Sequence, residues 1–172
     1  MPIYFSNTLN HNPFQFDSIG NNWTQEAVRR AQGYPQYHYL QTEEGCGILV
    51  LDNKEYLLPE GHGVLITPHI PHAYHSATQS DWITCFATFG GSLEPQLSHI
   101  FGTERILFTE KEQAAEIKAA IDRSVTHFET EPNNLHQLSC DCYSLLLHFS
   151  GGFVNSNTSD LPWEKYVHPV LK

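Results

Sequence analysis

The sequence predicts a mainly β fold, an antiparallel β-barrel of the double-sheet jelly-roll kind followed by a C-terminal antiparallel α-helical hairpin. Residues 23–89 form short apolar runs separated by Gly- and Pro-containing corners, which is typical of a β-sandwich or barrel. Residues 109–150 change to apolar residues at helical spacing. Pro132, followed by two asparagines, interrupts this region and divides it into two helices.

Composition limits the classes of function. The chain has 172 residues, of which 40% are hydrophobic and 16% charged, as in a globular domain with its own core. A net charge of −10 would repel a phosphate backbone, so direct nucleic-acid binding is not expected. Four cysteines without a Cys-x-x-Cys pair favour reduced thiols. No segment resembles a signal peptide or has the ~20 apolar residues of a membrane span, so we expect a cytoplasmic protein.

The first 20 residues are expected to form an N-terminal arm. Residues 1–20 are polar and are interrupted by Pro2, Pro13 and Gly20, which argues against a core element. Phe14 and Phe16 are isolated aromatic residues in this stretch. The arm could be a frayed terminus, but its aromatic side chains favour an arm that docks on another surface.

The barrel is expected to occupy residues 21–92. Its strands are predicted at 27–31, 37–41, 48–51, 55–58, 64–67 and 82–89, with the His-x-Tyr pair of His72 and Tyr74 before the last one. Residues 52–54, Asp-Asn-Lys, predict a hairpin turn. Residues 59–63, Pro-Glu-Gly-His-Gly, predict the next corner.

Residues 93–154 are expected to hold the helices. Thr109 and Glu112 have the spacing of a capping box, which predicts a helix start, and Ile117, Ile121 and Phe128 then follow helical spacing. The apolar stripe of the second helix either packs on the barrel or contacts a second copy of the chain. The candidates for dimerisation on this stripe are Leu138, Cys142, Leu145, Leu146 and Phe149. Residues 155–172 are expected to be a polar linker and the start of a further domain that this chain does not contain.

Alternation along the strands predicts a cavity with polar and aromatic walls. His72 and Tyr74 share one strand face, and Trp82, Thr84, Phe86 and Thr88 share another, because side chains two residues apart point the same way. If both faces turn inward, the cavity offers an imidazole, a phenol, a hydroxyl group and two ring faces. That set suits a sugar or another polar, partly apolar small molecule. In the alternative, Trp82 and Phe86 are ordinary core and His72 bonds to a backbone carbonyl.

Arg30 lies just before the second predicted strand of the barrel, at residues 37–41. It could reach a ligand hydroxyl or carboxylate through its planar guanidinium group. A surface ion pair is the alternative. His69, His72 and His75 suggest a metal site, but strand alternation places His72 opposite the other two, so no metal is expected. No nucleophile elbow, phosphate loop or dinucleotide fingerprint is present, so neither an enzyme nor a cofactor is expected.

Several motifs occur in an order that resembles the AraC-type transcription regulators. They are Gly45-x-Gly47, Pro59-x-Gly61, Pro68, Pro71-His72-x-Tyr74, Trp82-x(6)-Phe89-Gly90 and the Trp163–Val167 run. The resemblance implies a cupin-like barrel with a helix pair, a small-molecule effector that is often a sugar, and a homodimer formed through the helices. It also implies that DNA is bound only by a C-terminal helix-turn-helix domain, which this chain does not contain.

The resemblance also implies roles for single residues. Arg30 matches a ligand-contacting arginine, Tyr74 a pocket tyrosine, and Phe86 a tryptophan that stacks on the sugar, whereas Thr84 replaces a histidine. An N-terminal arm that folds over the ligand would bring Phe16 and Phe14 to the site. The metal motif of the wider cupin superfamily is incomplete here, because residues 34–39 contain a single histidine.

These observations predict an effector-sensing and dimerisation domain in which ligand binding shifts the population of two states. A metal-dependent cupin enzyme, such as an isomerase or dioxygenase, is the first alternative. An oligomerisation module with a filled barrel is the second.

Overall fold

Segments far apart in the sequence assemble into two sheets and a helical layer. The protein is described from a computed structural model, which describes residues 4–5, 12–150 and 167–169. The strands are β1 (Tyr4–Phe5), β2 (Gln15–Thr24), β3 (Val28–Arg30), β4 (Tyr37–Glu44), β5 (Cys46–Leu51), β6 (Lys54–Pro59), β7 (Gly63–Ile66), β8 (His72–Ser76), β9 (Ile83–Gly90), β10 (Ile106–Thr109) and β11 (Val167–Pro169). The helices are the 3-10 helix η1 (Glu94–Gln96), α1 (Ser98–Phe101), α2 (Lys111–Thr130) and α3 (Leu135–Ser150).

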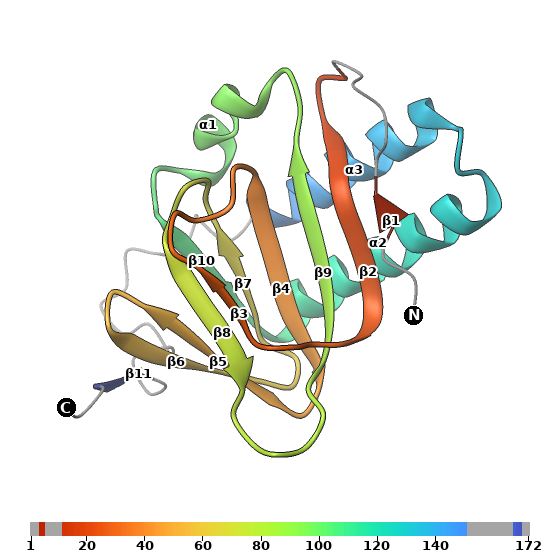
Figure 1. Cartoon of the computed structure of the whole chain (residues 1–172). Helices are drawn as coiled ribbons and strands as arrows, with labels where there is room; N and C mark the ends of the chain where they lie inside the picture. Colours follow the sequence, from red (N-terminus) through yellow and green to blue (C-terminus); the bar gives the residue numbers. More distant parts are fainter. Residues whose placement is uncertain (1–3, 6–11, 151–166, 170–172) are drawn as a thin grey trace.

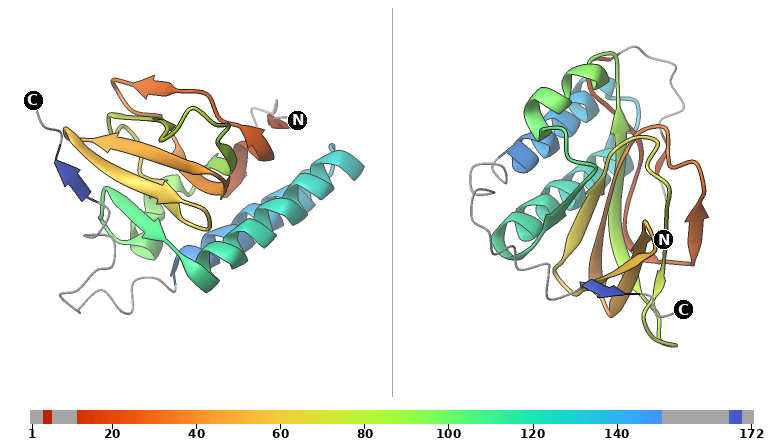
Figure 2. Two further views of the ribbon diagram at one scale, coloured as in Figure 1. Left: turned by 90° about the horizontal axis from the view of Figure 1, so that it is seen from below. Right: turned by 90° about the vertical axis from the view of Figure 1, so that its left-hand side faces the viewer.

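The strands form two antiparallel sheets that face each other (Figures 1 and 2). The six-stranded sheet has the order β1-β2-β9-β4-β7-β10, and the five-stranded sheet has the order β11-β6-β5-β8-β3. Helices α2 and α3 lie side by side across the outer face of the six-stranded sheet. The predicted fold class, a double-sheet β-barrel followed by a helical hairpin, is therefore confirmed.

Each face of the six-stranded sheet has its own apolar core. On strand β9 the odd-numbered residues Cys85, Ala87 and Phe89 pack against the helices. Phe86 instead faces the five-stranded sheet, in a core that it shares with Leu40, Leu49, Leu58, Val64, Tyr74 and Trp82. The period of two along β9 thus separates the helix side from the interior of the barrel.

The hairpin turn predicted at residues 52–54 is present between β5 and β6. Asp52 and Asn53 have φ angles of 50° and 60°, so both central residues of this two-residue loop are left-handed. A type I′ turn requires this geometry, and Asp and Asn tolerate it better than most residues.

The prediction that residues 1–20 form an N-terminal arm is wrong for residues 15–20. Gln15–Thr24 form strand β2, between β1 and β9, and Phe16 and Ile19 are fully buried. Two register shifts, between Phe16 and Ser18 and between Gly20 and Trp23, break the alternation that would have revealed a strand. Residues 1–3 and 6–11 of the predicted arm lie outside the described residues.

The other predicted boundaries also change. Strand β10 belongs to the six-stranded sheet, although residues 93–154 were expected to be helical. In the predicted linker, Val167–Pro169 pair with Tyr56, Glu55 and Lys54 of β6, and residues 155–166 and 170–172 lie outside the described residues.

The capping box predicted from Thr109 and Glu112 is wrong. Thr109 ends strand β10, and its hydroxyl group lies 2.6 Å from the Tyr39 hydroxyl oxygen. Glu110 is the N-cap residue of α2 and makes no side-chain capping hydrogen bond. The sequence pattern occurs here, but pairing of β10 with β7 holds Thr109 in extended conformation, away from the helix terminus.

Packing on the sheet occupies the whole stripe that was expected to mediate dimerisation. The buried residues of this stripe are Leu138, Cys142, Leu145, Leu146 and Phe149, and none of them is more than 7% exposed. They cannot contact a second copy while α3 stays on the sheet. The exposed face of α3 carries Tyr143 and Leu147 instead, with exposed fractions of 46% and 48%.

The length and apolar character of the helices decide whether any of them could span a membrane. Within the residues that the structure describes, none of the helices has the length and apolar character needed to cross a bilayer.

Candidate functional site

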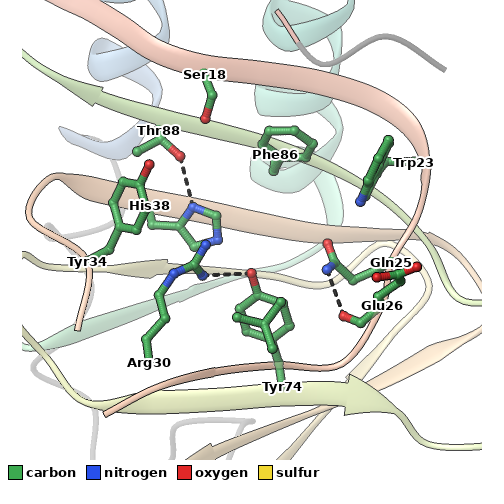
Figure 3. Close-up of a pocket in the computed structure, with 11 residues that line it drawn as sticks. Ser18, Trp23, Gln25, Glu26, Arg30, Tyr34, His38, Tyr74, Phe86 and Thr88 are labelled. Carbon is green, nitrogen blue, oxygen red and sulfur yellow. Dashed lines mark hydrogen bonds between the residues drawn. The ribbon is translucent and has the colours of Figure 1, made fainter. Parts of the chain in front are cut away.

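A pocket of about 230 Å³ opens between the two sheets. Its lining residues are Ser18, Trp23, Gln25, Glu26, Val28, Arg30, Tyr34, His38, Tyr74, Phe86 and Thr88 (Figure 3). The inner face of the six-stranded sheet contributes Ser18, His38, Phe86 and Thr88. The five-stranded sheet contributes Val28, Arg30 and Tyr74, because β3 pairs with β8 at the edge of that sheet.

Arg30 is held in a fixed position in this pocket. Its Nη1 donates a hydrogen bond of 2.8 Å to the Tyr74 hydroxyl oxygen. Its guanidinium carbon lies 4.7 Å from the centroid of the Tyr34 ring and 5.8 Å from that of the Tyr74 ring. Cation–π attraction to both rings and the hydrogen bond orient the guanidinium group before any ligand arrives.

Tyr34 is the second polar group of the wall. Its hydroxyl group donates a hydrogen bond of 2.9 Å to Asp17 Oδ2. Burial and the Asp17 carboxylate raise the pKa of Tyr34 to about 12, so it remains a neutral phenol at physiological pH. The pKa of Tyr74 is also raised, mainly by burial, although Arg30 opposes that shift.

His38 is a buried, neutral imidazole in the floor of the pocket. Its Nδ1 lies 3.0 Å from Thr88 Oγ1, and the residue is 4% exposed. Burial lowers the pKa of His38 to about 3, and the nearby positive charge of Arg30 acts in the same direction. Among the described residues, its Nε2 has no hydrogen-bond partner.

His72 lies behind the pocket wall and does not line it. Its Nδ1 donates to the Ile70 carbonyl oxygen at 2.7 Å, so the neutral ring carries its lone pair on Nε2. Burial lowers the pKa of His72, and its ring centroid lies 6.3 Å from that of His38. The alternative interpretation of the sequence, a histidine bonded to a backbone carbonyl, describes this residue.

Of the residues expected to bind a ligand, Arg30, Tyr74 and Phe86 line the pocket. Trp82 is instead buried in the core between the sheets, where its Nε1 donates to Thr42 Oγ1 at 2.9 Å. Thr84 is also buried, and its hydroxyl group lies 3.3 Å from Gln25 Oε1. Thr84 therefore acts on the pocket only through Gln25.

The two phenylalanines expected to reach the ligand lie elsewhere. Phe16 is on the helix side of β2, with its ring centroid 6.3 Å from that of Phe128. Phe14 stacks on Tyr143 of α3, with ring centroids 5.3 Å apart. The cause is the register of β2, which turns Ser18 toward the pocket and Phe16 away from it.

Sequence reasoning missed several residues of the wall. These are Ser18, Trp23, Gln25, Glu26, Val28, Tyr34 and His38. Thr88 lines the pocket as its parity with Phe86 predicted, although it was not among the candidate ligand contacts. Ser18 could not be found from the sequence, because it lies in the segment predicted to be an arm. Val28 could not be placed at the pocket either, because the pairing of β3 with β8 was not predicted.

A second, larger groove of about 390 Å³ lies between the N-terminal segment and α3. Its lining residues are Asn12, Pro13, Phe14, His136, Ser139, Cys140 and Tyr143. Ser139 Oγ donates to the Phe14 carbonyl oxygen at 2.7 Å, which fixes the chain against the helix. This groove contains no ordered set of charged groups comparable with Arg30 and its neighbours.

The pocket has no group of side chains suited to a metal ion among the described residues. Within residues 4–5, 12–150 and 167–169, no three His, Cys, Asp or Glu side chains come together in a way that could hold a metal ion. The four cysteines are free thiols, and Cys85 and Cys142 are buried.

A two-sheet barrel with a small polar pocket and a helical cover defines a small-molecule-binding domain of the cupin-like type. The family model described as "AraC-like ligand binding domain" matches residues 16–146. The chain belongs to this family, as its motifs implied. A search of curated protein sequences gave no match.

Solved structures show the same fold at low sequence identity. The AraC-like transcriptional activator CuxR superposes with a TM-score of 0.57 at 8% identity, over 95% of this chain and 66% of CuxR. Apo ToxT K231A from Vibrio cholerae strain SCE256 gives a TM-score of 0.56 at 15% identity, over 95% of this chain and 59% of ToxT. The chain therefore spans less than two thirds of the length of either protein.

Proposed function

We propose that this chain senses a small polar effector for an AraC-type transcription regulator, and that the effector binds in the pocket between the sheets. The observation that carries this proposal is the guanidinium group of Arg30, which Tyr34 and Tyr74 hold in place at the wall of an inter-sheet cavity. The ring of Phe86 supplies an apolar surface beside it. Small-molecule sites combine such apolar faces with a few fixed polar groups.

The size of the pocket restricts the effector. A cavity of about 230 Å³ lies below the ~300–1,000 Å³ typical of sites for drug-sized ligands, so it suits a molecule of roughly monosaccharide size. Hydroxyl groups of Ser18 and Thr88 and the amide of Gln25 can bind ligand hydroxyls. A carbohydrate, the class that the resemblance suggested, is therefore one candidate.

A route leads from the pocket to the helices. Strand β2 contributes Ser18 and Trp23 to the pocket, and between them Asn21 Nδ2 donates to Asp122 Oδ1 of α2 at 2.8 Å. Lys118 Nζ lies 2.7 Å from Asp122 Oδ2 and 2.9 Å from Glu43 Oε1, which joins α2 to β4. A ligand that moves β2 would therefore shift the position of α2, and with it any domain that follows or any second copy that binds the helices.

Retention of a metabolite by the purified chain tests this proposal without assuming the ligand. The protein is mixed with a pool of bacterial small metabolites, separated by gel filtration and analysed by mass spectrometry. Val28→Trp, which extends a ring into the pocket, should abolish retention. Arg29→Trp is the control, because Arg29 is the exposed neighbour on the same strand. Equal retention by Val28→Trp, or no retained compound, would count against the proposal.

The metal-dependent enzyme remains a second candidate from the sequence, and it has a separate readout. Elemental analysis of the purified protein should find no stoichiometric Fe, Mn, Ni or Zn. A metal at one equivalent that is lost in His38→Ala would favour the enzyme instead.

A further inference from the structure

Arg30 is a cation without an ion-pair partner among the described residues, in a protein that has acidic groups in excess. The chain carries 19 acidic and 9 basic residues. Arg105 pairs with Asp52, and Lys118 pairs with Glu43 and Asp122. No carboxylate oxygen of the described residues lies within the 4.0 Å of an ion pair with Arg30.

The groups around Arg30 do not neutralise it. The Asp17 carboxylate accepts a hydrogen bond of 2.9 Å from the Tyr34 hydroxyl group and forms no ion pair with Arg30 within 4.0 Å. Glu26 is exposed and lies at the opposite end of the pocket from Arg30 (Figure 3). The remaining polar neighbours, Tyr74 and His38, are neutral side chains whose charged forms burial disfavours. Arg30 therefore brings a positive charge without an ion-pair partner among the described residues to this end of the pocket.

The guanidinium group retains donors for a ligand. Only one of its five N–H groups, on Nη1, is used by Tyr74. The guanidinium carbon lies 4.7 Å from the centroid of the Tyr34 ring, and no further hydrogen bond joins the guanidinium group to a side chain of the described residues, so its other N–H groups are available. An available planar edge with parallel N–H groups matches the two oxygens of a carboxylate.

We propose that the effector is a small organic acid whose carboxylate pairs with Arg30. The body of the acid lies along the ring faces of Phe86 and Trp23, and its far polar groups reach Gln25 and Glu26. This inference rests on the proposed function, since it names the chemical class that the same pocket accepts. A sugar acid meets all of these conditions, and a small aromatic acid meets the carboxylate and ring-face conditions, whereas a neutral sugar leaves Arg30 without a counter-ion.

Matched pairs of acids and neutral analogues test the charge requirement. The probes are D-galacturonate against D-galactose, and benzoate against benzamide, titrated by calorimetry into the whole chain. We expect the acid of at least one pair to bind at least about tenfold more tightly than its neutral analogue, as a charge-assisted hydrogen bond would give. Raising the salt concentration should weaken the acid but not the neutral analogue.

Variants on one strand locate the effect. Arg30→Met should weaken binding of the preferred acid at least about tenfold, while Arg29→Met, on the exposed face of the same strand, should change it less than about twofold. Arg30→Lys, which keeps the charge but loses the planar edge, should fall between them. Circular dichroism checks that each variant is folded, and the salt dependence of the unmodified chain needs no variant.

Three results of these titrations would overturn the inference. They are equal affinity for both members of each pair, an acid affinity that Arg30→Met leaves unchanged, and no binding by either acid. A neutral compound that is retained by the chain and lost in Val28→Trp would refute the acid requirement while leaving the effector-binding function intact.

Discussion

At the scale of single residues, His38 shows how burial fixes the charge of the site. Its folded pKa of about 3 lies below the value of ~6.5 for an exposed histidine. Arg30, His72, Tyr34 and Tyr74 surround it, and none of them offers a negative charge. The neutral ring can therefore hydrogen-bond a ligand without competing with Arg30 for the ligand carboxylate.

The same burial makes stability depend on pH. Between pH 6.5 and about 3 the unfolded chain binds a proton at residue 38 that the folded chain excludes. The contribution of His38 is fully present above pH 6.5 and is lost as pH falls toward 3, by at most about 1.4 kcal/mol per pH unit. His72 acts in the same direction. Urea unfolding at pH 7, 6 and 5 should show a smaller pH dependence for His38→Gln than for the unmodified chain, and an identical slope would refute this assignment.

Gly47 is required by the ring of Trp82. A Cβ atom at Gly47 would overlap Trp82 Cζ2, whose position is fixed by the bond from Nε1 to Thr42. Gly47→Ala should lower the free energy of unfolding by about 1–3 kcal/mol, because the ring must move or lose that bond. Gly90→Ala is the matched control, since its nearest neighbour would be Gln36 Cγ at an ordinary 3.5 Å. Equal effects in urea unfolding would contradict the proposed packing.

At the scale of elements, a buried ion pair joins α2 to the edge of the barrel. The Glu43 side chain is only 7% exposed and relies on Lys118 for its counter-charge. Lys118→Met should lower the free energy of unfolding by about 2 kcal/mol, less than for a fully buried pair because Lys118 is 36% exposed. Lys111→Met on the same helix, at an exposed pair, should cost less than about 0.5 kcal/mol.

A second substitution at Glu43 shows whether the loss of stability in Lys118→Met comes from the broken ion pair or from the substitution itself. Adding Glu43→Gln to Lys118→Met should recover part of the lost stability, because no buried carboxylate then remains unpaired. Additive losses in the double variant would mean that the two residues do not interact. Thermal or urea unfolding of the unmodified chain, the two single variants and the double variant completes the cycle.

The elements differ in how much the sequence revealed of them. The helical stripes and the two-residue turn at Asp52 and Asn53 follow local rules, so the hairpin and both long helices could be predicted. Strand β2 could not be predicted, because its bulges hide the alternation of buried and exposed residues. Its Gly20 also looks like an interruption of a strand in the sequence, whereas in the structure it makes room for the Phe86 ring, whose Cε1 would lie 2.8 Å from an added Cβ. Thr109 had the residue type of a helix cap but is held by pairing of β10.

The candidate site was also predictable only in part, because local patterns do not show which strands pair or how deep a side chain lies. Parity on β9 placed Phe86 correctly inside the barrel, and the resemblance to the family pointed to Arg30 and Tyr74. Depth within the barrel is not encoded by parity, so Trp82 and Thr84 were assigned to the wall although they lie in or behind the core. His38 becomes a pocket residue only once β4 pairs with β9.

At the scale of the whole molecule, the pocket and the helices are connected through β2. Ligand binding should slow amide hydrogen exchange in residues 111–130, since occupancy of the pocket steadies β2 and its contact from Asn21 to Asp122. Asn21→Ala should keep its affinity for the ligand, because Asn21 does not line the pocket, but should lose that protection in α2. Hydrogen exchange read by mass spectrometry checks both statements, and full protection in Asn21→Ala would contradict the route.

Chemical-shift mapping of the labelled chain tests the central claim most directly, since it reports where a small acid binds. On titration with D-galacturonate or benzoate, we expect the largest changes at the Arg30 side chain and at the amides of Ser18, Phe86 and Thr88. Changes confined to Phe14, Cys140 and Tyr143, in the groove on α3, would place the ligand outside the barrel and contradict the proposed effector pocket.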